Sequence, residues 1–214
     1  IGRAARVAAN VLPDSIEEFA IVYLSSGMEM NRVKIWRKDL EQVQLARGSL
    51  EEIWVHTEIG PPQSGSPQNM IPNPDRYPHF EWGIGPGVRQ HVGGPSKFIL
   101  YQVWARANAR LDLMPGLFFT ASYGHNLYNN FDRIRLESDS VLSHVRSDIK
   151  EYLQQGESAL VLLQGDYVFS PASQVFARLS AGLFEEMYGG VSSEILYRPF
   201  NSRLAIGAEF NWVR

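Results

Sequence analysis

The sequence of 214 residues contains no cysteine. Disulfide bonds and thiolate metal sites are therefore excluded, and the composition fits an outer-membrane protein. Long apolar runs are also lacking, because the longest, such as residues 20–24 and 159–163, are far shorter than the roughly 20 residues of a membrane helix. A chain of this kind can cross a membrane only as a β-barrel, in which the backbone groups are paired between strands.

The sequence also lacks a strong excess of charge of one sign. The chain has 20 basic and 23 acidic side chains and a formal net charge of -3 at pH 7, which argues against a nucleic-acid partner. We find no nucleophile elbow, P-loop, zinc-ligand spacing or dinucleotide fingerprint in the sequence. We therefore expect no enzymatic activity and no cofactor. The hydrophobic content of 44% excludes a polar disordered chain, but barrels and soluble domains share it.

The C-terminal stretch 191–214 alternates between apolar and polar residues. Side chains of a strand point to opposite faces in turn, so this alternation predicts strands with one apolar and one polar face. A turn at residues 199–202 joins two such runs into a hairpin. The apolar positions of the second run are Leu204, Ile206, Ala208, Phe210 and Trp212.

Residues 1–59 differ from the rest of the chain and predict a small α/β domain. The expected elements are a helix at 2–12, strands at 18–24 and 28–36, a helix at 39–46 with Gly48 as its C-cap, and a strand at 53–59. Residues 60–79 are rich in proline, which makes a chain stiff and poor in sheet hydrogen bonds. We interpret 60–79 as a linker.

Residues 80–214 alternate in about seven runs, which predicts an antiparallel meander from a transmembrane β-barrel. Short turns at 114–116, 170–173 and 199–202 fall on one side, and the long charged stretch 129–157 falls on the other. Outer-membrane barrels have short periplasmic turns, so we expect 1–59 in the periplasm and 129–157 outside the cell. Bacterial barrels have an even number of strands, and the sequence opens at Ile1 without a signal peptide, so we expect an incomplete mature chain.

The polar faces of these strands are the best candidate for function. Charged and amide groups with aromatic rings can bind a sugar polymer along a path, while the same charges can equally form an internal salt-bridge plug. The candidate residues, expected to point into the lumen, are Arg89, Trp104, Arg106, Arg110, Asp112, Arg178, Glu194, Arg198 and Glu209.

Other candidate sites have plainer explanations. The acid pair Glu185-Glu186 cannot flank one bond, because adjacent strand residues face opposite ways. A cation could be bound by side chains in and near the long loop, but a solvated loop is the simpler interpretation; these side chains are His125, Asp132, Asp139, His144 and Asp148. The glycines of 83–87 resemble a phosphate loop only superficially, since strand glycines more often mark bends or close packing.

Several stretches resemble the YjbH/YbjH family of outer-membrane proteins, which is linked to exopolysaccharide production and secretion. The resemblance covers chiefly residues 80–214, and the α/β domain resembles the family less distinctly. The stretches are 131–132, 144–148 with Tyr152, 183–190, 194–200 and 211–214. The resemblance implies a location and a pathway, and it brings no catalytic residues.

These observations together predict an outer-membrane barrel that assists exopolysaccharide production or export. Its expected partners are the lipid bilayer, an exopolysaccharide and other proteins of the secretion pathway. Two alternatives stay open: a barrel that scaffolds periplasmic partners through 1–59, and a soluble β-sandwich that binds carbohydrate.

Overall fold

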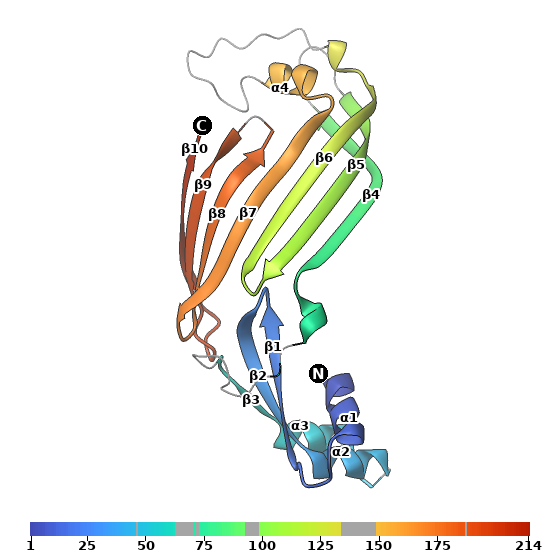
Figure 1. The fold of residues 1–214 in the computed structure, drawn as a ribbon, viewed down its shortest axis with the longest axis vertical. Helices are drawn as coiled ribbons and strands as arrows, with labels where there is room; N and C mark the ends of the chain where they lie inside the picture. Colours follow the sequence, from blue (N-terminus) through green and yellow to red (C-terminus); the bar gives the residue numbers. More distant parts are fainter. Residues whose placement is uncertain (46, 63–70, 72, 93–98, 134–148, 187) are drawn as a thin grey trace. The chain divides into compact units, whose positions relative to one another are not determined.

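The computed structural model describes residues 1–45, 47–62, 71, 73–92, 99–133, 149–186 and 188–214 (Figure 1). The chain divides into two compact units, one comprising Ile1–Ile71, Val168–Ala177 and Ile195–Ala208, and the other Pro72–Tyr167, Arg178–Glu194 and Glu209–Arg214. No helix among these described residues is long and apolar enough to span a membrane.

The first unit contains a three-stranded antiparallel sheet in the order β1-β2-β3. One of its faces and the helices share a core of Ala5, Phe19, Val33, Ile35 and Leu40. The elements are α1 (Gly2–Val11), β1 (Glu18–Ser25), β2 (Met28–Trp36), α2 (Arg37–Gln44), α3 (Leu50–His56) and β3 (Glu58–Gly60).

The predicted order of elements in this region is wrong at one place. Residues 53–56 are the last turn of α3, and only Glu58–Gly60 form a strand. The helix begins with a capping box, in which the Ser49 hydroxyl accepts from the Glu52 backbone N–H at 3.3 Å and the Glu52 carboxylate accepts from the Ser49 N–H at 3.1 Å. Gly48 is not the C-cap of the preceding helix α2, which ends at Gln44 and has Leu45 as its C-cap.

Seven strands form the second sheet, in the meander order β10-β9-β8-β7-β6-β5-β4 (Figure 1). This arrangement confirms a mainly β, antiparallel fold, although β4 and β10 lie at opposite edges and the sheet is not closed within the described residues. The strands are β4 (His79–Val92), β5 (Ile99–Met114), β6 (Leu117–Asn129), β7 (Ala159–Ala172), β8 (Val175–Glu185), β9 (Tyr188–Tyr197) and β10 (Ile206–Val213).

The two faces of this sheet differ as the alternation predicts. Ala107 is paired with Ile84 and Tyr123, whereas its neighbour Asn108 is paired with Gly83 and Ser122. The large apolar side chains are exposed, Trp82 at 71% and Ile84 at 70%, so no second layer formed by the described residues covers them. We call this the apolar face and the opposite side, which carries Arg106, Asp166 and Arg178, the polar face. The weaker alternation in 158–169 has a physical cause, since β7 shifts register at Leu162/Leu160 against β6.

Short elements occupy the predicted linker and the long loop. In 60–79, Pro74–Arg76 form the 3-10 helix η1, and β4 already begins at His79. In 129–157, the 3-10 helix η2 (Phe131–Arg133) and α4 (Ile149–Gln155) are folded. Residues 63–70, 72 and 134–148 lie outside the described part of the chain.

Candidate functional site

An ion-paired cluster links β8, β9 and β10 on the polar face. The Arg178 guanidinium lies 2.8 Å from the Glu194 carboxylate and 3.7 Å from that of Glu209. Glu209 also accepts hydrogen bonds from the Ser192 hydroxyl and the Asn211 amide. Three of the predicted residues therefore meet in one cluster. Its charged side chains stay more than a third exposed, so solvent screening leaves each pair worth at most about 1 kcal/mol.

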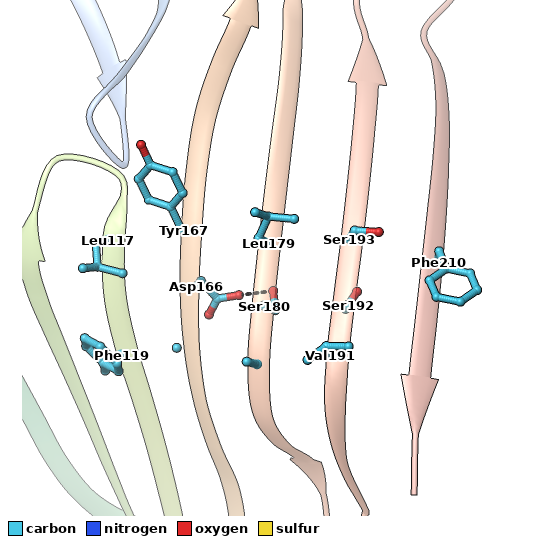
Figure 2. Close-up of a pocket in the computed structure, with 12 residues that line it drawn as sticks. Leu117, Phe119, Asp166, Tyr167, Leu179, Ser180, Val191, Ser192, Ser193 and Phe210 are labelled. Atoms are coloured by element: carbon cyan, nitrogen blue, oxygen red, sulfur yellow. Dashed lines mark hydrogen bonds between the residues drawn. The ribbon is translucent and has the colours of Figure 1, made fainter.

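A second cluster, around Asp166, is buried. The Asp166 carboxylate accepts from the Ser180 hydroxyl at 2.6 Å and from the Gln164 amide at 2.8 Å, and the residue is 2% exposed. Figure 2 shows the Asp166–Ser180 bond between β7 and β8. The alternation of residues 159–169 puts Asp166 on the polar side of its strand, although Asp166 is not among the candidate residues named from the sequence. The signal that could have identified Asp166 is the presence of a hydrogen-bond donor, Ser180, on the polar side of the next strand.

Trp104 lies flat against the polar face of β4, β5 and β6. A Cβ atom built on Gly87 would collide with the indole Nε1, and one built on Gly124 would lie 2.6 Å from Cζ3. The Arg89 guanidinium covers the ring, 4.4 Å from its centroid. Trp104 is 6% exposed, so it offers no open ring face on which a sugar could stack.

Arg89 also shows that the sheet is strongly curved. Its Nη1 donates to Glu186 Oε2 at 3.1 Å, and its Nη2 donates to Glu186 Oε1. Arg89 is on β4, whereas Glu186 follows β8, and four strand spacings of a flat sheet would separate them by about 19 Å. A bidentate pair across that span requires the polar face to be concave.

A buried amide side chain, that of Gln102, lies at one end of the polar face. Gln102 is fully buried and donates to the Asn126 side chain at 3.1 Å and to the Glu157 carbonyl at 2.8 Å. Nearby, Phe131 and Leu153 from the long loop pack on Leu100 of β5. The described ends of the predicted solvated loop therefore fold back onto the sheet.

The other predicted residues make separate contacts. Arg110 donates to Asp112 at 2.8 Å and lies 3.9 Å from the ring centroid of Phe118. Arg106 donates through Nε to the Ser122 hydroxyl at 2.9 Å. Arg198 lies just beyond the end of β9 and is exposed, with its backbone N–H bonded to the Gln174 carbonyl.

Two grooves cross the sheet, one on each face. The groove on the apolar face has a volume of about 560 Å³ and is lined by side chains such as Leu117, Leu179 and Phe210 (Figure 2). The groove beside the Arg178 cluster has a volume of about 450 Å³ and is lined by polar and aromatic groups, including Gln164 and Tyr188.

The alternative sites considered above gain no geometric support. Glu186 is engaged by Arg89, while Glu185 lies in the lining of the second groove. Among the described residues no three acidic or histidine side chains are grouped as metal ligands. Asp139, His144 and Asp148 lie outside the described residues, and His125 contacts Ser158. Residues 83–87 are part of β4 and not a phosphate loop.

Comparison with known proteins identifies the family to which the chain belongs. The family model described as "YjbH: Exopolysaccharide biosynthesis protein YbjH" matches residues 1–214. The chain belongs to the YjbH family. The match includes the N-terminal helices and the three-stranded sheet, which resembled the family less distinctly in sequence.

One curated YjbH relative is similar in sequence. The "Uncharacterized lipoprotein YjbH" of Escherichia coli (strain K12) is 35% identical over 138 residues. The match covers 63% of this chain and 20% of the relative, so the chain spans about a fifth of that protein's length. No solved structure gives a significant match.

Proposed function

We propose that this chain is part of a β-barrel of the bacterial outer membrane, that it assists exopolysaccharide production or export, and that its role is not enzymatic. The observation that carries the proposal is the contrast between the two faces of the seven-stranded sheet. One face exposes large apolar side chains, while the other is concave and rich in charged and amide groups. A barrel wall has this distribution, with lipid outside and water inside.

The height of the apolar face fits a bilayer. Phe80 and Phe119 flank Leu111 near one end of β5, and the ring of Tyr101 lies tilted against that of Tyr128 near the other, with ring centroids 5.7 Å apart. The ten residue-to-residue steps from Tyr101 to Leu111 span about 34 Å along the strand. At a tilt of about 45° this rise is about 24 Å, close to the roughly 25 Å of an apolar band flanked by aromatic residues.

The family description supports the exopolysaccharide part of the proposal. The curated relative is named a lipoprotein, which favours membrane association for this chain too. The connections Pro115-Gly116 and Ser173-Gln174 are short, as periplasmic turns are, so we assign them, and residues 1–59 with them, to the periplasm.

The polar face has two proposed roles, a path for a sugar polymer and an internal network of salt bridges, and its contacts assign different residues to each. Arg89, Arg110 and Arg178 are each paired with a carboxylate of the same sheet, which favours a stabilising network at these positions. Arg106 is not paired in this way, so we assign contact with a polymer to its surroundings.

A scaffold for periplasmic partners is the second candidate function. On α3, Trp54 and Val55 are 64% and 79% exposed, and exposed apolar side chains of this size can bind a partner protein. A soluble sandwich is less favoured, because a sandwich would bury the apolar face of the sheet.

Charge placed on either face of β5 tests the proposal. Ala107→Arg puts a guanidinium on the proposed lipid face and should cost roughly 2–4 kcal/mol of folding free energy near the midplane. Asn108→Arg faces the interior and should be tolerated. Folding into lipid vesicles measures both variants, and surface exopolysaccharide in cells should fall with Ala107→Arg, because that variant folds poorly into the membrane. Equal damage from both variants would contradict the assignment of faces, and unchanged exopolysaccharide would contradict the proposed role.

A further inference from the structure

Arg106 differs from the other arginines of the polar face. Arg89, Arg110 and Arg178 each contact a carboxylate. Among the described residues Arg106 is in ion-pair contact with no carboxylate; its Nε donates to the Ser122 hydroxyl, and its guanidinium carbon lies 6.0 Å from the ring centroid of Trp104. Its two terminal nitrogens are therefore left for another acceptor.

The orientation of Arg106 is set by its neighbours. Its Nε donates to the Ser122 hydroxyl at 2.9 Å, and that hydroxyl donates to Asn108 Oδ1 at 2.9 Å. Ser122 is only 2% exposed, so its hydroxyl anchors the guanidinium from the buried side of the polar face. The same bonds leave the Asn108 amide nitrogen as a second donor beside the guanidinium.

The space beside Arg106 is open. Gly85 is its direct cross-strand partner on β4, and Gly83 is the partner of Asn108. A Cβ atom at Gly83 or Gly85 would meet no heavy atom of the described residues within 4 Å, whereas the one at Gly87 would run into the indole of Trp104. Glycine in the middle of a strand can mark a bend or close packing, or a place where a ligand approaches the backbone, and the open space here fits the last of these.

We propose that Arg106 and Asn108, over the uncovered backbone of Gly83 and Gly85, bind the carboxylate of an acidic sugar residue in the polymer. The planar guanidinium matches a carboxylate through two parallel hydrogen bonds. The Asn108 amide is placed to donate to a sugar oxygen on the same residue. This inference rests on the proposed function and specifies its substrate class as a uronic-acid-type polymer.

Binding of defined oligosaccharides to the native protein, purified in detergent, tests the subsite. The probes are a galacturonic acid oligomer and a glucose oligomer of equal length, followed by calorimetry. Wild-type protein should bind the acidic oligomer more tightly. Arg106→Gln should weaken that binding about tenfold or more, because a hydrogen-bonded charge pair is lost. Arg203→Gln removes the same charge from an exposed position outside the sheet and should change binding less than roughly twofold.

Substitution of Gly85 gives a second test that leaves Arg106 in place. Gly85→Glu puts a carboxylate directly opposite the guanidinium and should abolish binding of the acidic oligomer. Gly85→Gln introduces a side chain of the same size without the charge and should keep most of the binding of the acidic oligomer. Equal loss in Arg106→Gln and Arg203→Gln, or equal binding of both oligomers by wild-type protein, would overturn the proposal.

Failure of the subsite and failure of the proposed function are distinguishable. If the protein folds into vesicles and supports exopolysaccharide but Arg106→Gln binds normally, only the subsite is wrong. If Arg106-dependent binding is found while Ala107→Arg folds normally into vesicles, the subsite stands and the membrane assignment is wrong.

Discussion

Trp104 illustrates how a single side chain on the polar face depends on its neighbours. Its indole covers Gly87 and Gly124 and is covered in turn by Arg89. An aromatic ring that is buried on one side by backbone and on the other by a guanidinium stabilises the sheet and cannot move aside easily. The same strand also carries Gly85, where no neighbour occupies the space above the backbone.

Two alanine substitutions on β4 test this packing. Gly87→Ala should lower the free energy of unfolding by about 1–3 kcal/mol, because its methyl group overlaps the Trp104 ring. Gly85→Ala, two residues away on the same face, has open space and should be neutral or slightly stabilising. Urea titration followed by tryptophan fluorescence compares the two variants. Equal midpoints would mean that Trp104 does not pack as described.

At the scale of the element, α3 shows where a short apolar run misleads. Residues 53–59 contain isoleucine, valine and threonine, which favour strands, yet Leu50–His56 form a helix. The capping box at Ser49 and Glu52 supplies backbone partners that begin the helix. Hydrogen bonds from the backbone and from Ser49 also lower the pKa of Glu51 in the first turn.

Removing the cap gives a prediction for this helix. Ser49→Ala should lower the free energy of unfolding by about 1 kcal/mol, because the backbone N–H of Glu52 loses its hydrogen-bond acceptor. The pKa of Glu51 should rise toward its ordinary value, as measured by an NMR titration. Ser15→Ala, in an exposed turn, is the control and should change neither quantity. A helix that exchanges its amide protons as slowly in Ser49→Ala as in wild type would contradict the role of the cap.

For the whole molecule, the two ends of β7 are the best reporters of topology. Gln155 in α4 precedes the strand, and Ser173 follows it, so a membrane-spanning sheet would put them on opposite sides of the bilayer. Both residues are exposed, and the chain has no native cysteine to confuse the result.

Thiol labelling in intact cells should separate these two positions. A membrane-impermeant reagent should label Gln155→Cys at once and Ser173→Cys only after the outer membrane is opened. The reverse pattern would put residues 1–59 outside the cell. Labelling of both positions in intact cells would point to a surface-exposed soluble protein and would contradict the export proposal.

The sequence by itself determined the strands of the seven-stranded sheet and the contrast between their faces. Alternation with a period of two is a local property, because successive side chains of any extended chain point to opposite sides. The turn at Pro115-Gly116 was equally readable, since proline and glycine act on their own backbone, but Gly189 and Gly190, which the sequence also suggested as a turn, lie within β9.

Only the tertiary structure decided which polar groups meet. Arg89 pairs with Glu186, 97 residues away, because the sheet curves, and no local pattern records curvature. Trp104 was predicted to line a path but lies under Arg89, since its exposure depends on glycines of two neighbouring strands. Arg106 was one of several predicted arginines, and it stands apart because the register places Gly85, and no carboxylate, opposite it. Contacts between strands depend on register and curvature, which the whole sheet sets together.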